Sequence, residues 1–478
     1  MPVNYAATLF DDLPYTNLAI AAGIGATAYA AKVYTGGRKC IWERDWAGKL
    51  IMIAAPPEPT TWALIHHLLH LPSPPQILYL PPLPSPLPDD ILMMLQIIRL
   101  SASENPLAQL HCEALPPTPT GVRDFVRKWS TVQYGTAGEG GRRVDAIVLG
   151  GAWECFPPPE PYRPGLDEKD KVEEDWTPHQ YHFHLITALL PSLLRAPPER
   201  NIRIISLVSP GWSAAMPGLE AQMENKKVVG QTGPLAEAAK RGLTTFLFQT
   251  QLRLILDTLA SATYSKKEIV PDPDKPLVKA RDEEIQSNIL ALSVIMPWSR
   301  TEVVKPVWGE GSLLRWILWT LLYPLVLILS PSPPKSIQPI LYALSAPVKF
   351  PGEDLPPSPE DGRKDAAMPV TPAQSPEGKD VVDERVKAKA KTKDMDEITD
   401  PRRNGVRQGD VVRDCGVIDI PPVLHDRLLA AATYDKLEAE VEKGVKASEL
   451  REKAFGKTGA AGDGSTPKPT DERKVQFQ

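Results

Sequence analysis

Cysteine is scarce in this chain. Only four cysteines occur among its 478 residues, and none of them lies in a CxxC pair: Cys40, Cys112, Cys155 and Cys415. This spacing argues against a disulfide framework and a cysteine-based zinc site, and it predicts reduced thiols in a cytosol-facing protein. The chain also lacks a basic stripe interleaved with aromatic residues, and its net charge is −5. We therefore expect no nucleic acid among its partners.

Proline, by contrast, is abundant. The chain contains 52 prolines, about twice the usual share of roughly 5%. Many stand in clusters such as PPLPSPLP at 81–88 and PPPEPYRP at 157–164. Because proline breaks helices and strands, these clusters mark the connections between elements.

Apolar runs of strand length alternate with helical patterns along most of the chain. Strands are predicted at 48–55, 76–80, 107–115, 144–149, 202–208 and 289–296. Helices are predicted at 60–71, 91–99, 121–129, 179–194 and 235–261. The alternation predicts an α/β domain over 48–347, built on a doubly wound, seven-stranded parallel sheet with helices on both faces.

The run VDAIVLGGA at 144–152 is the most informative of these. It is a short apolar run that ends in Gly150 and Gly151, as expected of a buried parallel strand whose end opens into a ligand crevice.

The two ends of the chain differ from this domain. The segment at 17–33 is apolar and rich in Ala and Gly, so residues 1–40 are predicted as a membrane anchor, with a packed N-terminal helix as the alternative. Basic residues follow it and would keep the bulk of the chain in the cytosol. The tail at 352–478 is rich in charge and proline and is predicted to be mostly disordered. Within it we expect a short strand at 416–420 and an amphipathic helix at 428–445.

A second apolar segment lies at 313–329. A buried lid helix, a contact with one membrane leaflet and a true span all remain open for it.

Five segments together carry a resemblance to a known family. They are VDAIVLGGA at 144–152, HFHLITALLPSLL at 182–194, NIRIISLVSPGWSAAMP at 201–217, AAKRGLTTFLFQTQL at 238–252 and NILALSVIMPWSRT at 288–301. In order and spacing they resemble the second half of a short-chain dehydrogenase/reductase, and the resemblance extends over about 48–347. The chain is most similar to divergent, fungal-type members of that superfamily. The resemblance implies a Rossmann-like fold with an NAD(P) site at the carboxyl ends of the strands.

The cofactor positions implied by the resemblance are altered. Ala55 stands near the first glycine of the family's glycine-rich turn, and three prolines fill the loop: Pro56, Pro57 and Pro59. Prolines remove the amide donors that a pyrophosphate needs. Thr60 and Thr61 remain at a helix N-terminus that could still hold an anion. NAD(P) binding is therefore expected to be weak or lost, and the sequence indicates no preference between NAD and NADP.

Four further cofactor contacts are implied. Glu113 stands where the family places an aspartate beside the adenine, although an ordinary strand end explains it equally well. Gly150 and Gly151 would let the backbone approach the cofactor, and Thr301 keeps the last residue of the family's PG-x-x-T motif.

The catalytic positions implied by the resemblance are only partly kept. Ser209 aligns with the catalytic serine, with a serine of an ordinary turn as the alternative, and Lys240 aligns with the catalytic lysine. Ala236 replaces the tyrosine four residues before the lysine, and no tyrosine occurs anywhere in 201–256. The family uses this phenol as its proton donor, so its usual hydride transfer lacks an acid.

A metal site is not expected. His66 and His70 fall on one face of a predicted helix, but no third ligand lies nearby in the sequence.

Two functions follow from these observations. The first is a membrane-associated binding or scaffold module, facing the cytosol at the endoplasmic reticulum or the mitochondrial outer membrane, that has lost hydride transfer. The alternative is an active NAD(P)-dependent oxidoreductase that acts on a lipidic carbonyl or alcohol with a non-standard proton donor. A membrane surface and a lipidic small molecule are the partners expected, and the sequence does not indicate an oligomeric state.

Overall fold

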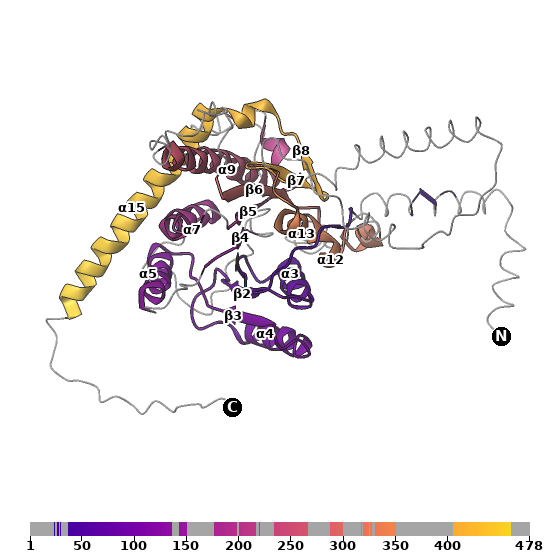
Figure 1. The fold of residues 1–478 in the computed structure, drawn as a ribbon, viewed down its shortest axis with the longest axis horizontal. Helices are drawn as coiled ribbons and strands as arrows, with labels where there is room; N and C mark the ends of the chain where they lie inside the picture. Colours follow the sequence, from indigo (N-terminus) through magenta and orange to yellow (C-terminus); the bar gives the residue numbers. More distant parts are fainter. Residues whose placement is uncertain are drawn as a thin grey trace, which may run out of the picture.

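The computed structural model describes most of the predicted domain and part of the tail. The described residues are 37–135, 143–150, 176–197, 200–216, 219, 234–265, 287–299, 330–349 and 405–459, with scattered residues in 23–29 and 317–326. Figure 1 shows one central sheet with helices packed on both of its faces.

The sheet contains eight strands in the order β3-β2-β1-β4-β5-β6-β7-β8. Their bounds are β1 Leu50–Ala54, β2 Gln76–Tyr79, β3 Gln109–Cys112, β4 Ala146–Leu149, β5 Ile202–Val208, β6 Ile289–Ile295, β7 Val411–Arg413 and β8 Gly416–Ile418. The strands from β1 to β7 are parallel, and β8 alone is antiparallel to its neighbour. This order confirms the doubly wound, Rossmann-like α/β fold predicted from the sequence.

The central strands are buried on both faces. Every residue of β1, β4, β5 and β6 is buried, which explains why their sequences are continuous apolar runs. Strand β4 pairs with β1 through Met52↔Ile147. The prediction that this run lies beside the first strand is therefore confirmed.

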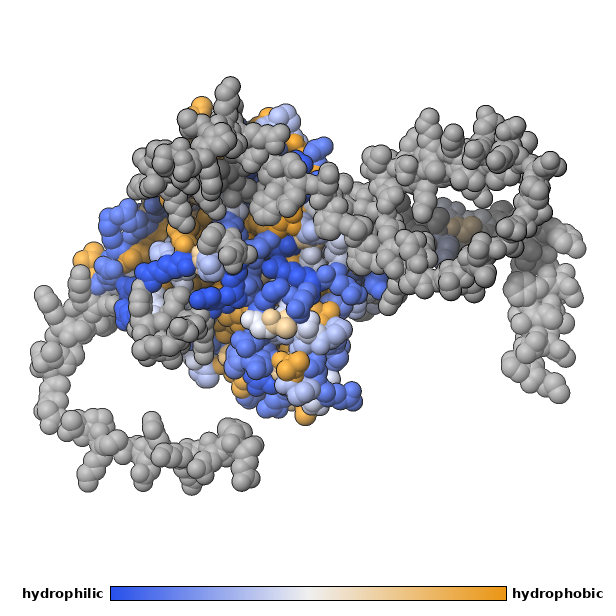
Figure 2. All heavy atoms as spheres, in the orientation of Figure 1, coloured by the Kyte–Doolittle hydropathy of each residue, from blue (hydrophilic) through white to orange (hydrophobic). Residues whose placement is uncertain are grey.

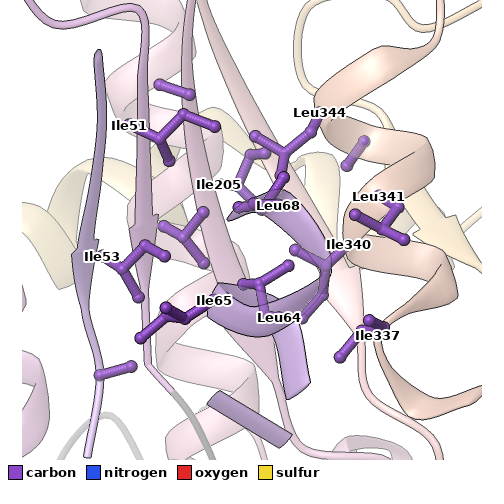
Figure 3. Close-up of a cluster of buried hydrophobic side chains, with 14 of the residues drawn as sticks. Ile51, Ile53, Leu64, Ile65, Leu68, Ile205, Ile337, Ile340, Leu341 and Leu344 are labelled. Atoms are coloured by element: carbon purple, nitrogen blue, oxygen red, sulfur yellow. The ribbon is translucent and has the colours of Figure 1, made fainter. Parts of the chain in front are cut away.

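In the described part of the chain, seven longer helices cover the two faces of the sheet. One face carries α3 Pro59–Leu69, α4 Asp89–Ser101 and α13 Gln338–Ser345, with the short α12 Pro333–Ser336 packed against α3. The other carries α5 Pro119–Gly135, α7 Pro178–Leu193, α9 Pro234–Ser265 and α15 Arg427–Gly459. Figure 3 shows side chains of β1, α3 and α13 meeting in the first of these layers.

An ion pair with a buried carboxylate connects the amino ends of β1, β4 and β5. Asp145, directly before β4, accepts hydrogen bonds from Arg200 Nε at 2.6 Å, from Arg200 Nη2 at 2.8 Å and from the Leu50 amide at 2.9 Å. Nearby, the fully buried Arg203 donates to the carbonyls of Ala343 and Ala346 at 2.7 and 2.6 Å. This guanidinium satisfies carbonyls at the C-terminus of α13 that have no partner within the helix. Burial holds the pKa of Arg203 well below its usual value.

The domain extends beyond the predicted boundary at 347. Strands β7 and β8 and helix α15 all come from the tail, so the sheet has eight strands rather than seven. Gln408 leads into β7: its Oε1 accepts from the Ala291 amide at 2.7 Å, and its Nε2 donates to the Ile289 carbonyl at 3.1 Å. The Gln408 side chain thus hydrogen-bonds to the edge of β6 directly before the backbone does so, since the Gly409 amide donates to the Ala291 carbonyl at 2.9 Å and the Ser293 amide donates to the Asp410 carbonyl at 3.1 Å.

The expected strand at 416–420 and helix at 428–445 are confirmed as β8 and α15. Helix α15 packs on α9, α7 and α5 and completes that layer. Residues 350–404 and 460–478 of the tail lie outside the described residues.

The apolar segments at 17–33 and 313–329 fall largely outside the described residues. In the part of the chain that the structure describes, no helix has both the length and the apolar character needed to cross a membrane.

Candidate functional site

The candidate site lies where the strand order reverses. From β1 the chain proceeds outward to β2 and β3, and from β4 it proceeds in the opposite direction toward β8. Ligands of doubly wound folds bind beyond the carboxyl ends of the strands at this switch point. The described residues that directly follow β1, β4, β5 and β6 therefore make up the candidate site.

The turn after β1 leads into helix α3 through prolines. Ala55 is buried, and the Glu58 amide donates to the Pro56 carbonyl at 2.9 Å. Helix α3 begins with Pro59, which has no N–H, and the Trp62 amide already donates to the Glu58 carbonyl at 2.9 Å. In the described first turn, Thr60 and Thr61 are the residues whose amides face the start of the helix, and Pro59 supplies no amide there.

Glu58 is a feature of this turn that the sequence reasoning missed. It occupies the N-cap of α3, and its side chain makes no capping hydrogen bond. A carboxylate at this end of a helix interacts favourably with the helix dipole and repels a second anion. With three prolines and a carboxylate at the helix N-terminus, the residues of the turn fit a dinucleotide pyrophosphate poorly. The signal in the sequence was an acidic residue directly before a proline at the start of a helix.

The ends of β2 and β3 contribute a phenol, a thiol and an ion pair. The Tyr79 hydroxyl is buried and has no hydrogen-bond partner among the residues that the structure describes, and its ring packs edge-on against Trp62 at 5.3 Å. Burial raises the pKa of Tyr79, and it raises the pKa of Cys112 to about 12. Glu113, the predicted adenine contact, pairs with Lys128 of α5 at 3.1 Å. Its carboxylate is thus already neutralised by a lysine.

Gly150 extends the pairing of β4 with β1. Its amide donates to the Ala54 carbonyl at 3.1 Å, and its φ is +95°. L-residues rarely adopt this conformation, so a glycine is required for the chain to leave the strand here. Gly151 and Thr301 lie outside the described residues.

Ser209 is buried in the turn after β5. Its Oγ accepts from the Gly211 amide at 3.2 Å, which is what a serine of an ordinary turn does. Gly242 of α9 packs directly on this turn, since a Cβ on it would lie 2.9 Å from Trp212 Cβ and 3.5 Å from Ser209 Cβ.

Trp298, in the segment after β6, lies over the same turn. A Cβ on Gly211 would be 3.7 Å from Trp298 Cη2, and the indole is 45% exposed. Ser330 Oγ donates to the Trp298 carbonyl at 2.8 Å and fastens this segment. The ring therefore covers the turn that holds Ser209.

Lys240 is not brought to Ser209. It precedes Gly242 by two residues, which is about 200° around a helix, so the two lie on different sides of α9. Within the described residues, no hydrogen bond or ion pair joins Lys240 to Ser209. Ala236 occupies the position of the missing phenol and is partly buried. Ser209 Oγ accepts its hydrogen bond from a backbone amide, and within the described residues no hydrogen bond joins this hydroxyl to an acidic side chain.

The two histidines considered as metal ligands, His66 in α3 and His70 at its C-cap, stack on each other. The rings of His66 and His70 stack at 4.1 Å, and the nitrogens of His70 lie 2.7 and 3.1 Å from the carbonyl oxygens of His66 and Ser101. Across the described residues, no group of three metal-ligating side chains converges.

No protein-family model and no curated protein matches the chain. Solved structures of short-chain dehydrogenases and reductases are similar to it, at low identity. A short-chain dehydrogenase from Mycobacterium paratuberculosis bound to NAD is 13% identical, with a TM-score of 0.33, and the match covers 63% of this chain and 93% of that one. A dehydrogenase/reductase from Sinorhizobium meliloti 1021 is 12% identical, with a TM-score of 0.33, and the match covers 62% of this chain and 87% of that one. A short-chain dehydrogenase from Mycobacterium smegmatis is 10% identical, with a TM-score of 0.31, and the match covers 65% of this chain and 92% of that one. These are proteins of the superfamily that the sequence resembles; the fold assignment itself rests on strand order and register.

Proposed function

We propose that this chain is a short-chain dehydrogenase/reductase-like protein that no longer performs the family's hydride transfer and that serves as a binding or scaffold module. The observation that carries the proposal is the turn between β1 and α3. Its prolines remove amide donors, and Glu58 brings a negative charge to the helix N-terminus where the family binds pyrophosphate. The turn around Ser209 supports it, since among the described residues the Ser209 hydroxyl hydrogen-bonds to a backbone amide and to no acidic side chain.

Titration of the full-length chain with NADH and NADPH tests the cofactor part. We expect weak binding or none to the natural chain, and tighter binding to Glu58→Gln, which removes the charge and keeps the size of the side chain. Glu104→Gln is the matched control, because Glu104 is exposed between α4 and β3, at the opposite ends of the strands from this turn. Low-micromolar affinity of the natural chain for NADPH would contradict the proposal.

The loss of catalysis has its own test. In cells that depend on this protein, Ser209→Ala and Lys240→Ala should both support growth as well as the natural chain does. Failure of both variants at normal protein levels would favour an enzyme.

Membrane association forms a second part of the proposal. The apolar segments at 17–33 and 313–329 motivate it, and three large apolar residues in the described part of the second segment are exposed: Ile317, Leu321 and Tyr323. We expect the chain to sediment with membranes of the endoplasmic reticulum or mitochondrial surface, with its domain facing the cytosol. Deletion of residues 1–33 should release much of it, and a full-length chain that stays in the supernatant would contradict this part.

The alternative is an NAD(P)-dependent oxidoreductase acting on a lipidic carbonyl or alcohol. Gly150, with its positive φ at the switch point, and Ser209, at the end of β5, favour it. It predicts cofactor consumption with lipidic aldehydes or ketones that Ser209→Ala abolishes. The binding module predicts no consumption with any of them.

A further inference from the structure

Four basic side chains lie together at the amino ends of the central strands, at the opposite ends from the candidate site. They are Arg44, Lys49, Arg200 and Arg203. Asp145 connects two of them, since it pairs with Arg200 and accepts from the amide of Leu50, the residue after Lys49. Arg44 joins them through hydrogen bonds of 3.3 Å to the carbonyls of Asn201 and Leu344.

This end of the sheet carries more positive than negative charge. Asp145 is neutralised by Arg200, and Arg203 donates to two carbonyls of α13. Arg44 and Lys49, which are both partly exposed, form no ion pair with a carboxylate of the described residues. In Figure 2, hydrophilic residues form a band across the middle of the molecule, where Figure 1 shows β2, β4 and β5.

Asp45 does not supply the missing negative charge. Its carboxylate accepts from the Ala47 amide at 3.0 Å, and the Lys49 ammonium donates to its main-chain carbonyl rather than to its carboxylate. The carboxylate is fully exposed, so water screens its attraction for the lysine. Two cations therefore remain without a paired anion at this end of the sheet.

Trp46 holds these two cations near each other. Arg44 Cζ lies 4.7 Å and Lys49 Nζ lies 5.8 Å from the centroid of the same buried indole. Their proximity has a cost, because burial, followed by the charges of Arg44 and Arg200, lowers the pKa of Lys49. An anion bound between Arg44 and Lys49 would remove this repulsion.

A phosphate group has the chemistry that these side chains recognise. A guanidinium donates parallel hydrogen bonds to two oxygens of an oxyanion, and an ammonium binds a third oxygen as a point charge. The dianion of phosphate also matches the charge of two cations, whereas a carboxylate carries only one charge.

We propose that Arg44 and Lys49, on the ring of Trp46 and beside Arg200, form a binding site for a phosphate group. Arg200 remains paired with Asp145 and contributes by its charge. The phosphate is free or part of a soluble compound, and a lipid headgroup offers the same chemistry. The site lies at the opposite ends of the strands from the candidate site, so the inference is independent of the proposed function.

Thermal unfolding of the full-length chain tests the proposal, with inorganic phosphate compared with sodium chloride at equal ionic strength. The Tm should rise further in phosphate and approach saturation as the site fills. Lys49→Gln removes one charged donor and should weaken phosphate binding by at least about tenfold. Lys443→Gln is the matched control, because Lys443 is exposed on α15, which packs on the other face of the sheet from α13. This control also accounts for the general stabilisation of proteins by phosphate.

Acetylation of lysines, followed by mass spectrometry, locates the bound phosphate. Inorganic phosphate should slow the acetylation of Lys49 and leave that of Lys443 unchanged. The same measurement with vesicles of phosphatidic acid and of phosphatidylcholine separates the two sources of the phosphate group. Protection of Lys49 by phosphatidic acid alone, without an effect of inorganic phosphate, would keep the site and assign its phosphate to a lipid headgroup.

Two results would overturn the proposal. The first is an equal rise of Tm in phosphate for Lys49→Gln and the natural chain, together with unchanged acetylation of Lys49 on phosphatidic acid vesicles. The second is equal protection of Lys49 and Lys443, which would show general screening of charge rather than a site.

Discussion

The contact between helix α15 and Trp176 can be tested by one substitution. Gly444 of α15 faces the indole so closely that a Cβ there would lie 2.3 Å from Cη2 and 2.6 Å from Cζ3 of Trp176. The indole is 93% buried and packs edge-on against His184 at 5.9 Å, so the ring has little room to withdraw. Gly444→Ala therefore overpacks this interface at a cost of about 1–3 kcal/mol.

Helix propensity opposes this cost. Alanine favours a helix interior over glycine by about 1 kcal/mol, so Gly444→Ala should leave the free energy of unfolding unchanged or lower it by up to about 2 kcal/mol. Lys443 is exposed on the same helix and supplies the control. At 443 the alanine variant should be more stable than the glycine variant by about 1 kcal/mol.

Urea denaturation followed by circular dichroism measures both differences. The preference for alanine over glycine should be smaller at 444 than at 443 by about 1–3 kcal/mol, the overpacking cost. An equal preference at the two sites would refute the docking of α15 on Trp176.

Three further results are expected. Arg200→Ala leaves the buried Asp145 carboxylate without its bidentate partner. This variant should lower the free energy of unfolding by about 3 kcal/mol. A loss below about 1 kcal/mol would contradict a stabilising role for this ion pair. Burial lowers the pKa of His184 from 6.5 to about 4. The unfolded chain therefore binds more protons between pH 6.5 and pH 4, and the free energy of unfolding should fall as the pH drops through this range. His184→Gln should reduce that fall by up to about 3 kcal/mol, and an unchanged slope would show that His184 is not buried in its neutral form. Burial raises the pKa of Cys40 to about 11 and that of Cys112 to about 12, so iodoacetamide at pH 8 should alkylate them much more slowly than it does in the urea-unfolded chain; equal rates would show that these thiols are accessible.

The sequence predicted the strands that form the centre of the sheet. Strands β1, β4, β5 and β6 are buried on both faces and therefore appear as continuous apolar runs, which periodicity detects. Beyond β6, the strand at 416–420 was expected, but β7 and its place beside β6 escaped prediction. Strands β7 and β8 have three residues each, and Gln408 pairs with β6 through its side chain. No local pattern of apolar residues records such a pairing.

Within the candidate site, the sequence predicted residues at strand ends but not residues whose role depends on their position in space. Ser209 and Gly150 were found because each ends a recognisable strand. Glu58 was missed because its effect depends on the helix that begins after it, and a sequence does not show where its charge lies in space. The position of Lys240 relative to Ser209 likewise depends on how α9 is rotated against the sheet.

The pairing of β6 with β7 also has a consequence for biosynthesis. Residues 405–413 close the edge of β6, yet they leave the ribosome only after all of α9, β6 and α13 have been made. Until then a nascent chain exposes the unpaired edge of one of its most apolar strands, and such an edge can pair with another chain. Correct assembly thus depends on keeping the growing polypeptide apart from its neighbours until its own late segment arrives. Translation speed and chaperone supply should affect the yield of this protein more than the strength of its central core would suggest.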